Sequence, residues 1–281
     1  MIHHQIKILY AQFITYGDIL ASTAIIRELK NKYDKSSIHY FTREDNKELL
    51  EFNPDIDQIY YERSLPIFEE YDIIFRPYYC LQKSGGWNLN NSHWLDLYAE
   101  VCGVKLLNYE LYFYNMSQFF TVPNDPYILV QSRTNDSAKD WDRYSEFVSL
   151  FKNKFEKIKV FQIGSGVQDT ISNIDGKYFN LRWSQVAKLI NNAITIVCLD
   201  SIAQHLAGAL NASYICLYGA KPSHLVRTGR FDNAKQIAIE PSRDECKTAC
   251  GFANCTKKVK CINTISPEFV LDLFDRKIFN G

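Results

Sequence analysis

Residues 199–219 read Leu-Asp-Ser-Ile-Ala-Gln-His-Leu-Ala-Gly-Ala-Leu-Asn-Ala-Ser-Tyr-Ile-Cys-Leu-Tyr-Gly. An apolar run over 193–199, broken only by Thr195, ends at Asp200-Ser201, and a segment rich in small residues leads on to a second apolar run over 214–218. This pattern predicts a strand, a turn, a helix and another strand. In open parallel sheets, ligands bind in the crevice at the carboxyl ends of the strands. A helix that begins there offers free N–H groups and a positive dipole end to a phosphate.

Composition narrows the class of protein. The chain has 281 residues, which is long for one domain and comfortable for two, and 46% of them are hydrophobic. Its 32 basic and 32 acidic side chains give a net charge of zero, so no nucleic-acid partner is expected. No apolar run approaches the roughly 20 residues of a membrane helix, and residues 1–7 lack the features of a signal peptide. We expect a cytoplasmic protein with at most peripheral membrane contact.

Strand and helix signals alternate along the chain, which predicts an α/β architecture with parallel sheets. The pattern restarts after the breaker sequence Pro123-Asn124-Asp125-Pro126. We therefore expect two Rossmann-like domains, residues 1–120 and 121–281, whose sheets face a central cleft. The expected strands cover 6–13, 37–42, 57–61, 71–75, 127–131, 159–163, 194–199 and 214–218. The expected helices begin at 17, cover 45–52, 93–102 (closed by Gly103), 142–155, 184–191 and the small-residue segment after 201, and begin again at Pro267.

The eight cysteines fall into two groups. Cys198 and Cys216 lie within apolar runs, as small buried hydrophobic residues would, and Cys80 and Cys102 are scattered. The other four crowd into a loop over 246–261: Cys246, Cys250, Cys255 and Cys261. Without an export signal, such a cluster suggests a metal site before a disulfide knot. Four thiolates can enclose a tetrahedral Zn or Fe ion, and because they would close its coordination sphere, the metal would be structural. Free or disulfide-paired thiols are the alternative.

Four sequence blocks, taken in order, resemble the ADP-heptose heptosyltransferases, family 9 of the glycosyltransferases. The blocks are Gly17-Asp18-Ile19-Leu20 with Thr23 and 26–30, Lys139-Asp140-Trp141, residues 164–169, and Asp200-Ser201 with His205-Leu206-Ala207 closing on Gly219. The resemblance implies a GT-B enzyme that inverts the anomeric centre without a catalytic metal. It implies a nucleotide-sugar donor, above all ADP-heptose, and a glycan, lipopolysaccharide core or protein acceptor. An oligomer is compatible with it.

The resemblance gives catalytic roles to two residues. Asp18 matches the family's candidate general base, which would take the proton of the attacking acceptor hydroxyl; such catalysis typically contributes about 10² to 10⁴-fold. The alternative for Asp18 is a helix N-cap. Lys139 would hold the departing diphosphate by electrostatic stabilisation, and its alternative is a solvated loop lysine. Trp141 is expected to be a packing residue that fixes this loop.

Further residues are candidates for donor binding. In the loop before Lys139 they are Thr134 and Asn135, and after the strand that ends at Gly164 they are Gln168 and Asp169, with Asp169 suited to a ribose hydroxyl. In the quoted segment they are Asp200 for sugar hydroxyls, Ser201 for the distal phosphate, and His205 for the phosphate or for orienting these groups. A plain loop is the alternative for 168–169, and a structural histidine is the alternative for His205. Ile202 stands where relatives usually carry Gly, which bears on the geometry of donor binding.

Two points stay open at this stage. The same fold could use a UDP- or GDP-sugar, because no residue identifies the base. The chain could also be a non-catalytic nucleotide- or glycan-binding module on that fold. The cysteine loop resembles the iron-binding knuckle of relatives that glycosylate bacterial autotransporter proteins.

Overall fold

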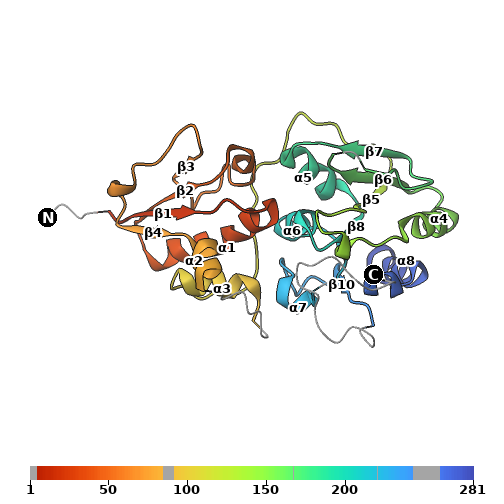
Figure 1. Ribbon diagram of the computed structural model, residues 1–281. Coiled ribbons are helices and arrows are strands. Elements are labelled where there is room, and N and C mark those ends of the chain that lie inside the picture. Colours follow the sequence, from red (N-terminus) through yellow and green to blue (C-terminus); the bar gives the residue numbers. More distant parts are fainter. Residues whose placement is uncertain (1–4, 85–91, 167, 220, 243–259) are drawn as a thin grey trace. The chain divides into compact units, whose positions relative to one another are not determined.

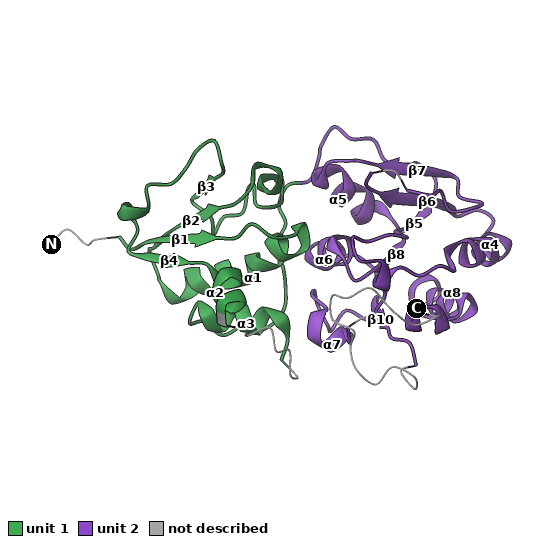
Figure 2. Ribbon diagram, viewed as in Figure 1, with its two compact units in different colours: residues 1–115 green, residues 116–281 purple. Residues whose placement is uncertain are grey.

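The computed structural model describes residues 5–84, 92–166, 168–219, 221–242 and 260–281. The chain divides into two compact units, Met1–Asn115 and Met116–Gly281 (Figure 2). Each unit has its own parallel sheet.

Unit 1 contains a sheet of four parallel strands in the order β3-β2-β1-β4 (Figure 1). The inner strand β1 (Lys7–Ala11) is almost wholly buried, and the long helix α1 (Tyr16–Lys32) buries ten of its residues. The strands are β1 Lys7–Ala11, β2 Ser37–Phe41, β3 Gln58–Tyr60 and β4 Ile73–Phe75. The helices are α1 Tyr16–Lys32, α2 Pro77–Ser84 and α3 Trp94–Val101, with 3₁₀ turns η1 Glu44–Leu49 and η2 Phe68–Glu70.

Unit 2 contains a sheet of six parallel strands in the order β10-β9-β8-β5-β6-β7. From β5 the chain first builds outward through β6 and β7, and then returns to place β8 on the other side of β5. The carboxyl ends of β5 and β8 are therefore the topological switch point, where open α/β sheets bind ligands. The strands are β5 Tyr127–Val130, β6 Lys159–Gly164, β7 Gly176–Phe179, β8 Thr195–Leu199, β9 Tyr214–Leu217 and β10 Gln236–Ile239. The helical segments are η3 Ser137–Lys139, α4 Tyr144–Lys154, α5 Trp183–Asn192, α6 Ile202–Ala209, α7 Ser223–Val226, η4 Cys261–Thr264, α8 Pro267–Phe274 and the final π-helical turn η5 Asp275–Phe279.

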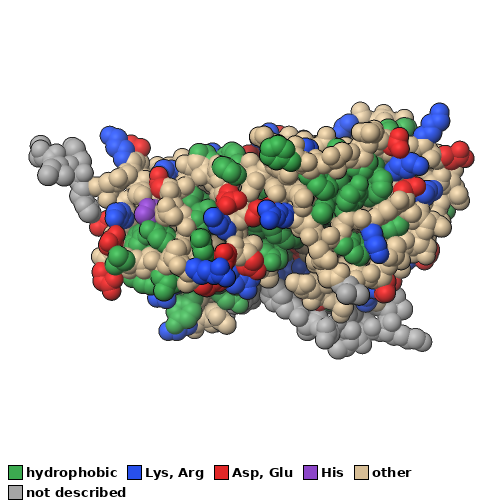
Figure 3. All heavy atoms as spheres, turned by 90° about the horizontal axis from the view of Figure 1, so that it is seen from above, with side chains coloured by type: hydrophobic (Ala, Val, Ile, Leu, Met, Phe, Trp, Pro, Cys, Tyr) green, Lys and Arg blue, Asp and Glu red, His purple; other side chains and the backbone are tan. Residues whose placement is uncertain are grey.

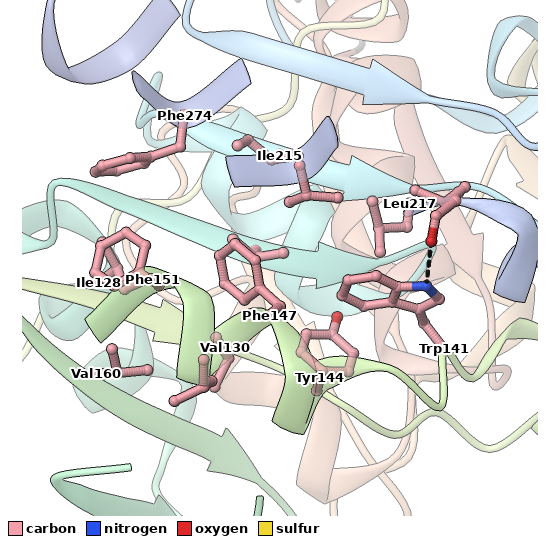
Figure 4. Packing of buried hydrophobic residues seen from close by; sticks show 14 of the residues in the cluster. Ile128, Val130, Trp141, Tyr144, Phe147, Phe151, Val160, Ile215, Leu217 and Phe274 are labelled. Atoms are coloured by element: carbon pink, nitrogen blue, oxygen red, sulfur yellow. Dashed lines mark hydrogen bonds between the residues drawn. The ribbon is translucent and has the colours of Figure 1, made fainter. Parts of the chain in front are cut away.

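The main core of unit 2 lies between one face of this sheet and the helices α4 and α8 (Figure 4). Phe151 of α4 and Phe274 of α8 meet edge to face, with ring centroids 5.0 Å apart. Trp141 is fully buried in the same cluster, and its indole Nε1–H donates to the carbonyl of Ile265 at 3.1 Å. Trp141 thus packs as predicted and ties the loop before α4 to the segment before α8.

The predicted α/β class with parallel sheets is confirmed, and every predicted strand is present, with shifted ends. Gly103 has a φ of +63°, as the predicted helix-closing residue requires. Cys198 and Cys216 are fully buried and lie opposite each other on β8 and β9. The helix predicted over 45–52 is wrong: η1 is a 3₁₀ helix that ends at Leu49. The sequence did not indicate α2, β7, α7 or β10.

Two further observations concern the charged side chains at the surface and the lengths of the helices. On the face shown in Figure 3, basic and acidic side chains are intermixed, in keeping with a net charge of zero. Within the described part of the chain, the structure contains no helix with the length and apolar character needed to cross a membrane.

Candidate active site

A buried ion pair lies at the switch point of unit 2. Asp200 directly follows β8, and Lys139 is the last residue of η3, in the loop that follows β5. The Lys139 ammonium Nζ donates to the Asp200 carboxylate Oδ2 at 2.7 Å and to the Asp200 carbonyl at 3.2 Å. The side chains are only 16% and 8% exposed. The alternative that Lys139 is a solvated loop lysine is therefore wrong.

The pair keeps both groups charged. Burial alone would lower the pKa of Lys139, but the charge and hydrogen bond of Asp200 outweigh burial, and the pKa is raised. Burial would likewise raise the pKa of Asp200, yet the Lys139 charge and hydrogen bond, aided by His205 and Lys221, leave it lowered. The site therefore carries a fixed ammonium whose third N–H has no partner among the described residues.

Helix α6 begins beside this pair. Ser201 is its N-cap, and the Ser201 hydroxyl oxygen accepts from the N–H of Ala203 at 3.3 Å. The Ser201 hydroxyl donates its hydrogen to Gln131 Oε1 at 2.7 Å, and Gln131 directly follows β5. The two strand ends of the switch point are thus joined by a side-chain hydrogen bond. The N–H groups of Gln204 and His205 bond to the Ser201 carbonyl at 3.1 and 3.2 Å, which leaves the N–H of Ile202 as the first-turn donor suited to a phosphate.

His205 lies one helical turn after Ser201 and is buried. Its Nδ1 hydrogen-bonds to the Thr228 hydroxyl at 2.6 Å, and the neighbouring Gln204 amide donates to the Thr228 carbonyl at 2.6 Å. Close approach is possible because α6 carries Gly208 at this contact: a Cβ there would lie 2.9 Å from the Thr228 carbonyl oxygen. His205 therefore has a structural contact on one ring nitrogen.

The loop after β5 is organised around Asp140. This buried carboxylate accepts from the Thr134 N–H at 2.9 Å and from the Arg133 guanidinium at 3.2 Å. The Thr134 hydroxyl turns inward to the Asp136 carbonyl at 2.7 Å, while Asn135 is exposed. Thr134 therefore shapes the loop, and Asn135 is the more accessible of the two predicted donor-binding residues.

Gln168 and Asp169 follow β6. The Gln168 amide donates to the Ser165 carbonyl at 2.7 Å, so that side chain folds back on its own loop. The Asp169 side chain is 95% exposed, with Oδ2 3.6 Å from the Arg133 guanidinium. Gln162 holds the segment in place, since its amide contacts both Ser132 Oγ and the Asp169 carbonyl at 3.1 Å.

Asp18 belongs to unit 1. Helix α1 begins at Tyr16 with Thr15 as its N-cap, so the alternative that Asp18 itself is the N-cap is wrong. Asp18 lies in the first turn, where a carboxylate suits the helix dipole, and its Oδ2 accepts from the Thr15 hydroxyl. Its charge also reaches the buried Tyr98, whose pKa is raised first by burial and then by Asp18.

The predicted cysteine site is described only in part. Cys246, Cys250 and Cys255 lie outside the described residues. Cys261 is half-buried at the start of η4, with its Sγ 3.7 Å from the Gly219 carbonyl. Across the described ranges, no three His, Cys, Asp or Glu side chains are grouped so that they could hold a metal ion.

Sequence reasoning missed four residues that build the unit 2 site. Gln131 accepts a hydrogen bond from Ser201, and Asp140 accepts one from the Thr134 N–H. The Thr228 hydroxyl is hydrogen-bonded to His205. The charge of the buried Lys221 helps to lower the pKa of Asp200. Two of them carried a signal: Asp140 belongs to the block Lys139-Asp140-Trp141, and Gln131 is a polar residue that directly follows a buried central strand and so faces the switch point.

The two parallel sheets and their strand orders define the class: this is the GT-B fold of glycosyltransferases. The family model described as glycosyltransferase family 9 (heptosyltransferase) matches residues 108–256, more than half of the chain. The chain therefore belongs to glycosyltransferase family 9 and is a glycosyltransferase.

Several solved structures share the fold. A family 9 glycosyl transferase from Veillonella parvula superposes with a TM-score of 0.71 at 14% identity, covering 98% of both chains. The iron-containing dodecameric glycosyltransferase TibC from enterotoxigenic Escherichia coli gives 0.78 at 14% identity, over 98% of this chain and 76% of that one. E. coli ADP-heptose lipopolysaccharide heptosyltransferase II gives 0.72 at 16% identity, over 98% and 99%. No curated protein sequence matches the chain.

Proposed function

We propose that this chain is an inverting transferase that moves heptose from ADP-heptose to a hydroxyl group of a glycan, a lipopolysaccharide core or a protein. The observation that carries the proposal is the Lys139–Asp200 pair beside the N-terminus of α6, which places a fixed ammonium and the positive end of a helix dipole at the switch point. Solved family relatives support the donor: TibC was determined with ADP-heptose and E. coli WaaC with ADP.

In this proposal unit 2 binds the donor and unit 1 serves the acceptor. The Lys139 ammonium and the Ile202 N–H at the start of α6 contact the diphosphate, where they stabilise the charge that develops as it leaves. Asp169 meets a ribose hydroxyl, with Asn135, Gln168 and His205 as further contacts. Asp200 keeps Lys139 charged and in place, a positioning role added to the sugar contact predicted for it.

The proposed transfer step requires a single general base, which takes up the proton of the acceptor hydroxyl. The acceptor oxygen bonds to the anomeric carbon from the side opposite the diphosphate, and the bond from that carbon to the phosphate oxygen breaks. ADP departs with the bonding electrons, and the hydroxyl proton passes to the Asp18 carboxylate. No metal ion takes part in this step.

The first experiment is a thermal-shift and calorimetry panel of the purified chain against ADP, UDP, GDP and ADP-heptose. A ligand at 100 times its Kd stabilises the folded state by about 2.7 kcal/mol. Selective stabilisation by ADP and ADP-heptose is expected. Stabilisation by UDP or GDP instead would mean that the enzyme uses a different nucleotide-sugar donor. No stabilisation by any of the four ligands would favour a non-catalytic module.

Turnover separates an enzyme from a binding module. Asp18→Ala should lower transfer by about 10² to 10⁴-fold and leave ADP affinity unchanged. Asp34→Ala, an exposed carboxylate that follows α1, is the control and should leave both unchanged. Equal turnover in Asp18→Ala and the wild type would remove Asp18 as the base.

We also propose a structural Zn or Fe ion on Cys246, Cys250, Cys255 and Cys261. Support comes from their spacing and from TibC, which is described as iron-containing. Elemental analysis of the purified chain should find about one metal ion per chain, which Cys250→Ser and Cys255→Ser each remove. A metal-free wild type that still melts cooperatively would contradict this proposal.

A further inference from the structure

A concavity on unit 1 lies along β3, the edge strand of its sheet. It has a volume of about 410 Å³ and includes the apolar side chains of Phe52, Ile56, Ile59 and Tyr61. All of its lining residues fall within 47–64. The concavity is shallow and open to solvent, and more of its lining is polar than apolar, in contrast to the mostly apolar clefts that bind drug-sized molecules.

Phe52 is unusual in both conformation and exposure. Its φ is +64°, in the left-handed region that disfavours a residue with a Cβ and that helix ends normally give to Gly or Asn. The side chain is nevertheless 75% exposed, so burial of the ring offsets little of the free energy that this backbone conformation costs. A strained backbone that holds a large ring in solvent beside a concavity is the kind of feature that accompanies ligand contacts.

Each charged side chain that lines the concavity has a counter-charge, either within the lining or just outside it. Lys47 Nζ pairs with Glu51 at 3.5 Å and lies 5.5 Å from the centre of the Tyr61 ring. The Asp57 carboxylate accepts from Lys30 at 2.9 Å and from the N–H of Ile38 at 2.8 Å. No excess charge is left to attract a phosphate or a carboxylate, while donors and acceptors remain for hydroxyl groups.

We propose that this concavity binds a neutral saccharide. Sugar rings present C–H faces that pack against aromatic rings, and here Phe52 and Tyr61 supply those rings. The hydroxyl groups at the ring edge need mixed donors and acceptors, which Lys47 and Glu51 provide. The site uses none of the residues proposed for transfer, so it stands independently of the donor assignment.

The test is retention of the fluorescently labelled full chain on an array of immobilised neutral and anionic oligosaccharides. The wild type should be retained on at least one neutral structure, and Phe52→Gly and Tyr61→Ala should each reduce retention at least tenfold. Leu65→Ala is the matched control, because Leu65 is 63% exposed and does not line the concavity. It should bind as the wild type does.

Phe52→Gly also separates binding from folding, because glycine adopts positive φ freely. Its melting temperature should equal or exceed that of the wild type while saccharide retention falls. Three results would overturn the proposal: no neutral saccharide is retained, only anionic ones are, or retention survives Phe52→Gly. The transfer reaction is tested separately by nucleotide binding and by Asp18→Ala, so the two proposals can fail independently.

Discussion

At the scale of single residues, the Lys139–Asp200 pair is the feature on which the proposed donor binding depends. Replacing Asp200 with Asn leaves a buried ammonium without its counter-charge, which typically costs about 3–5 kcal/mol. We expect Asp200→Asn to lower the free energy of unfolding by that amount at pH 7, measured by urea denaturation. Asp232→Asn, an exposed carboxylate of the same unit, should change it by less than about 0.5 kcal/mol.

The pH dependence of this loss follows from the direction of the two pKa shifts. The lowered pKa of Asp200 means that its contribution is complete above its unfolded value of about 3.9 and is lost as the pH falls through the folded value. The raised pKa of Lys139 means that its contribution is complete below about 10.4 and is lost as the pH rises through the folded value. The contribution of these two groups to the stability of the wild type should therefore be flat from about pH 5 to 9. In Asp200→Asn the burial of Lys139 is no longer opposed by the Asp200 charge, so the loss relative to the wild type should become smaller as the pH rises. A loss that grows as the pH rises would contradict this account of the pair.

The same residues show how much of the candidate site could be predicted from the sequence. Asp200 and Ser201 were predicted at the carboxyl end of a strand from its apolar pattern, and Lys139 was predicted to contact the diphosphate from the family resemblance. Their contacts were not predicted, because the pairing of Lys139 with Asp200, 61 positions away, and of Ser201 with Gln131, 70 positions away, depends on strand order. Local patterns predict strands but do not determine which strand ends become neighbours.

At the scale of elements, the start of α6 makes a second prediction. Ser201→Ala removes the N-cap and also leaves the buried Gln131 Oε1 without its donor. Ser266→Ala removes only an N-cap. The Ser266 hydroxyl oxygen caps α8 by accepting from the Phe269 N–H at 3.1 Å. A lost cap costs about 0.5–2 kcal/mol, and a buried acceptor without a partner adds about 1–3 kcal/mol. In urea denaturation, Ser201→Ala should be the more destabilising; equal losses would mean that the Gln131 contact contributes nothing.

The last turn of α6 contains a position at which a usual effect of substitution should be reversed. Gly to Ala inside a helix usually stabilises by about 0.5–1 kcal/mol. At Gly208, however, the new Cβ would lie 2.9 Å from the Thr228 carbonyl oxygen and 3.0 Å from Gly229 Cα, both backbone atoms that cannot move aside cheaply. We expect Gly208→Ala to lower the melting temperature and to disturb the His205–Thr228 contact. A higher melting temperature would show that the 228–229 loop yields easily.

The elements that the sequence did not indicate share a physical cause. β7 and β10 are the two edge strands of unit 2, each four residues long, and they begin with Gly176 and Gln236 in place of a continuous apolar run. Edge strands bury less apolar surface than central ones, so they need less of the hydrophobic signal from which strands are predicted. α7 has four residues, too few to show a helical period.

At the scale of the whole molecule, the division into two units makes the last prediction. Residues 116–281 carry their own six-stranded sheet, their own core between that sheet and α4 and α8, and the Lys139–Asp200 pair with α6. A unit with a core of its own should fold alone. We therefore expect a fragment of residues 116–281 to melt cooperatively and to bind ADP with a Kd within about tenfold of the full chain, since tenfold corresponds to only about 1.4 kcal/mol.

The complementary fragment is the control for that experiment. Residues 1–115 contain Asp18 but none of the residues proposed to bind the donor, so this fragment should not bind ADP in calorimetry at any concentration at which the larger fragment does. Neither fragment alone should catalyse transfer, because the proposed base and the proposed donor site belong to different units. ADP binding by residues 1–115, or its loss from a folded 116–281 fragment, would require unit 1 to contribute directly to the nucleotide site, and the assignment of donor binding to unit 2 would then be wrong.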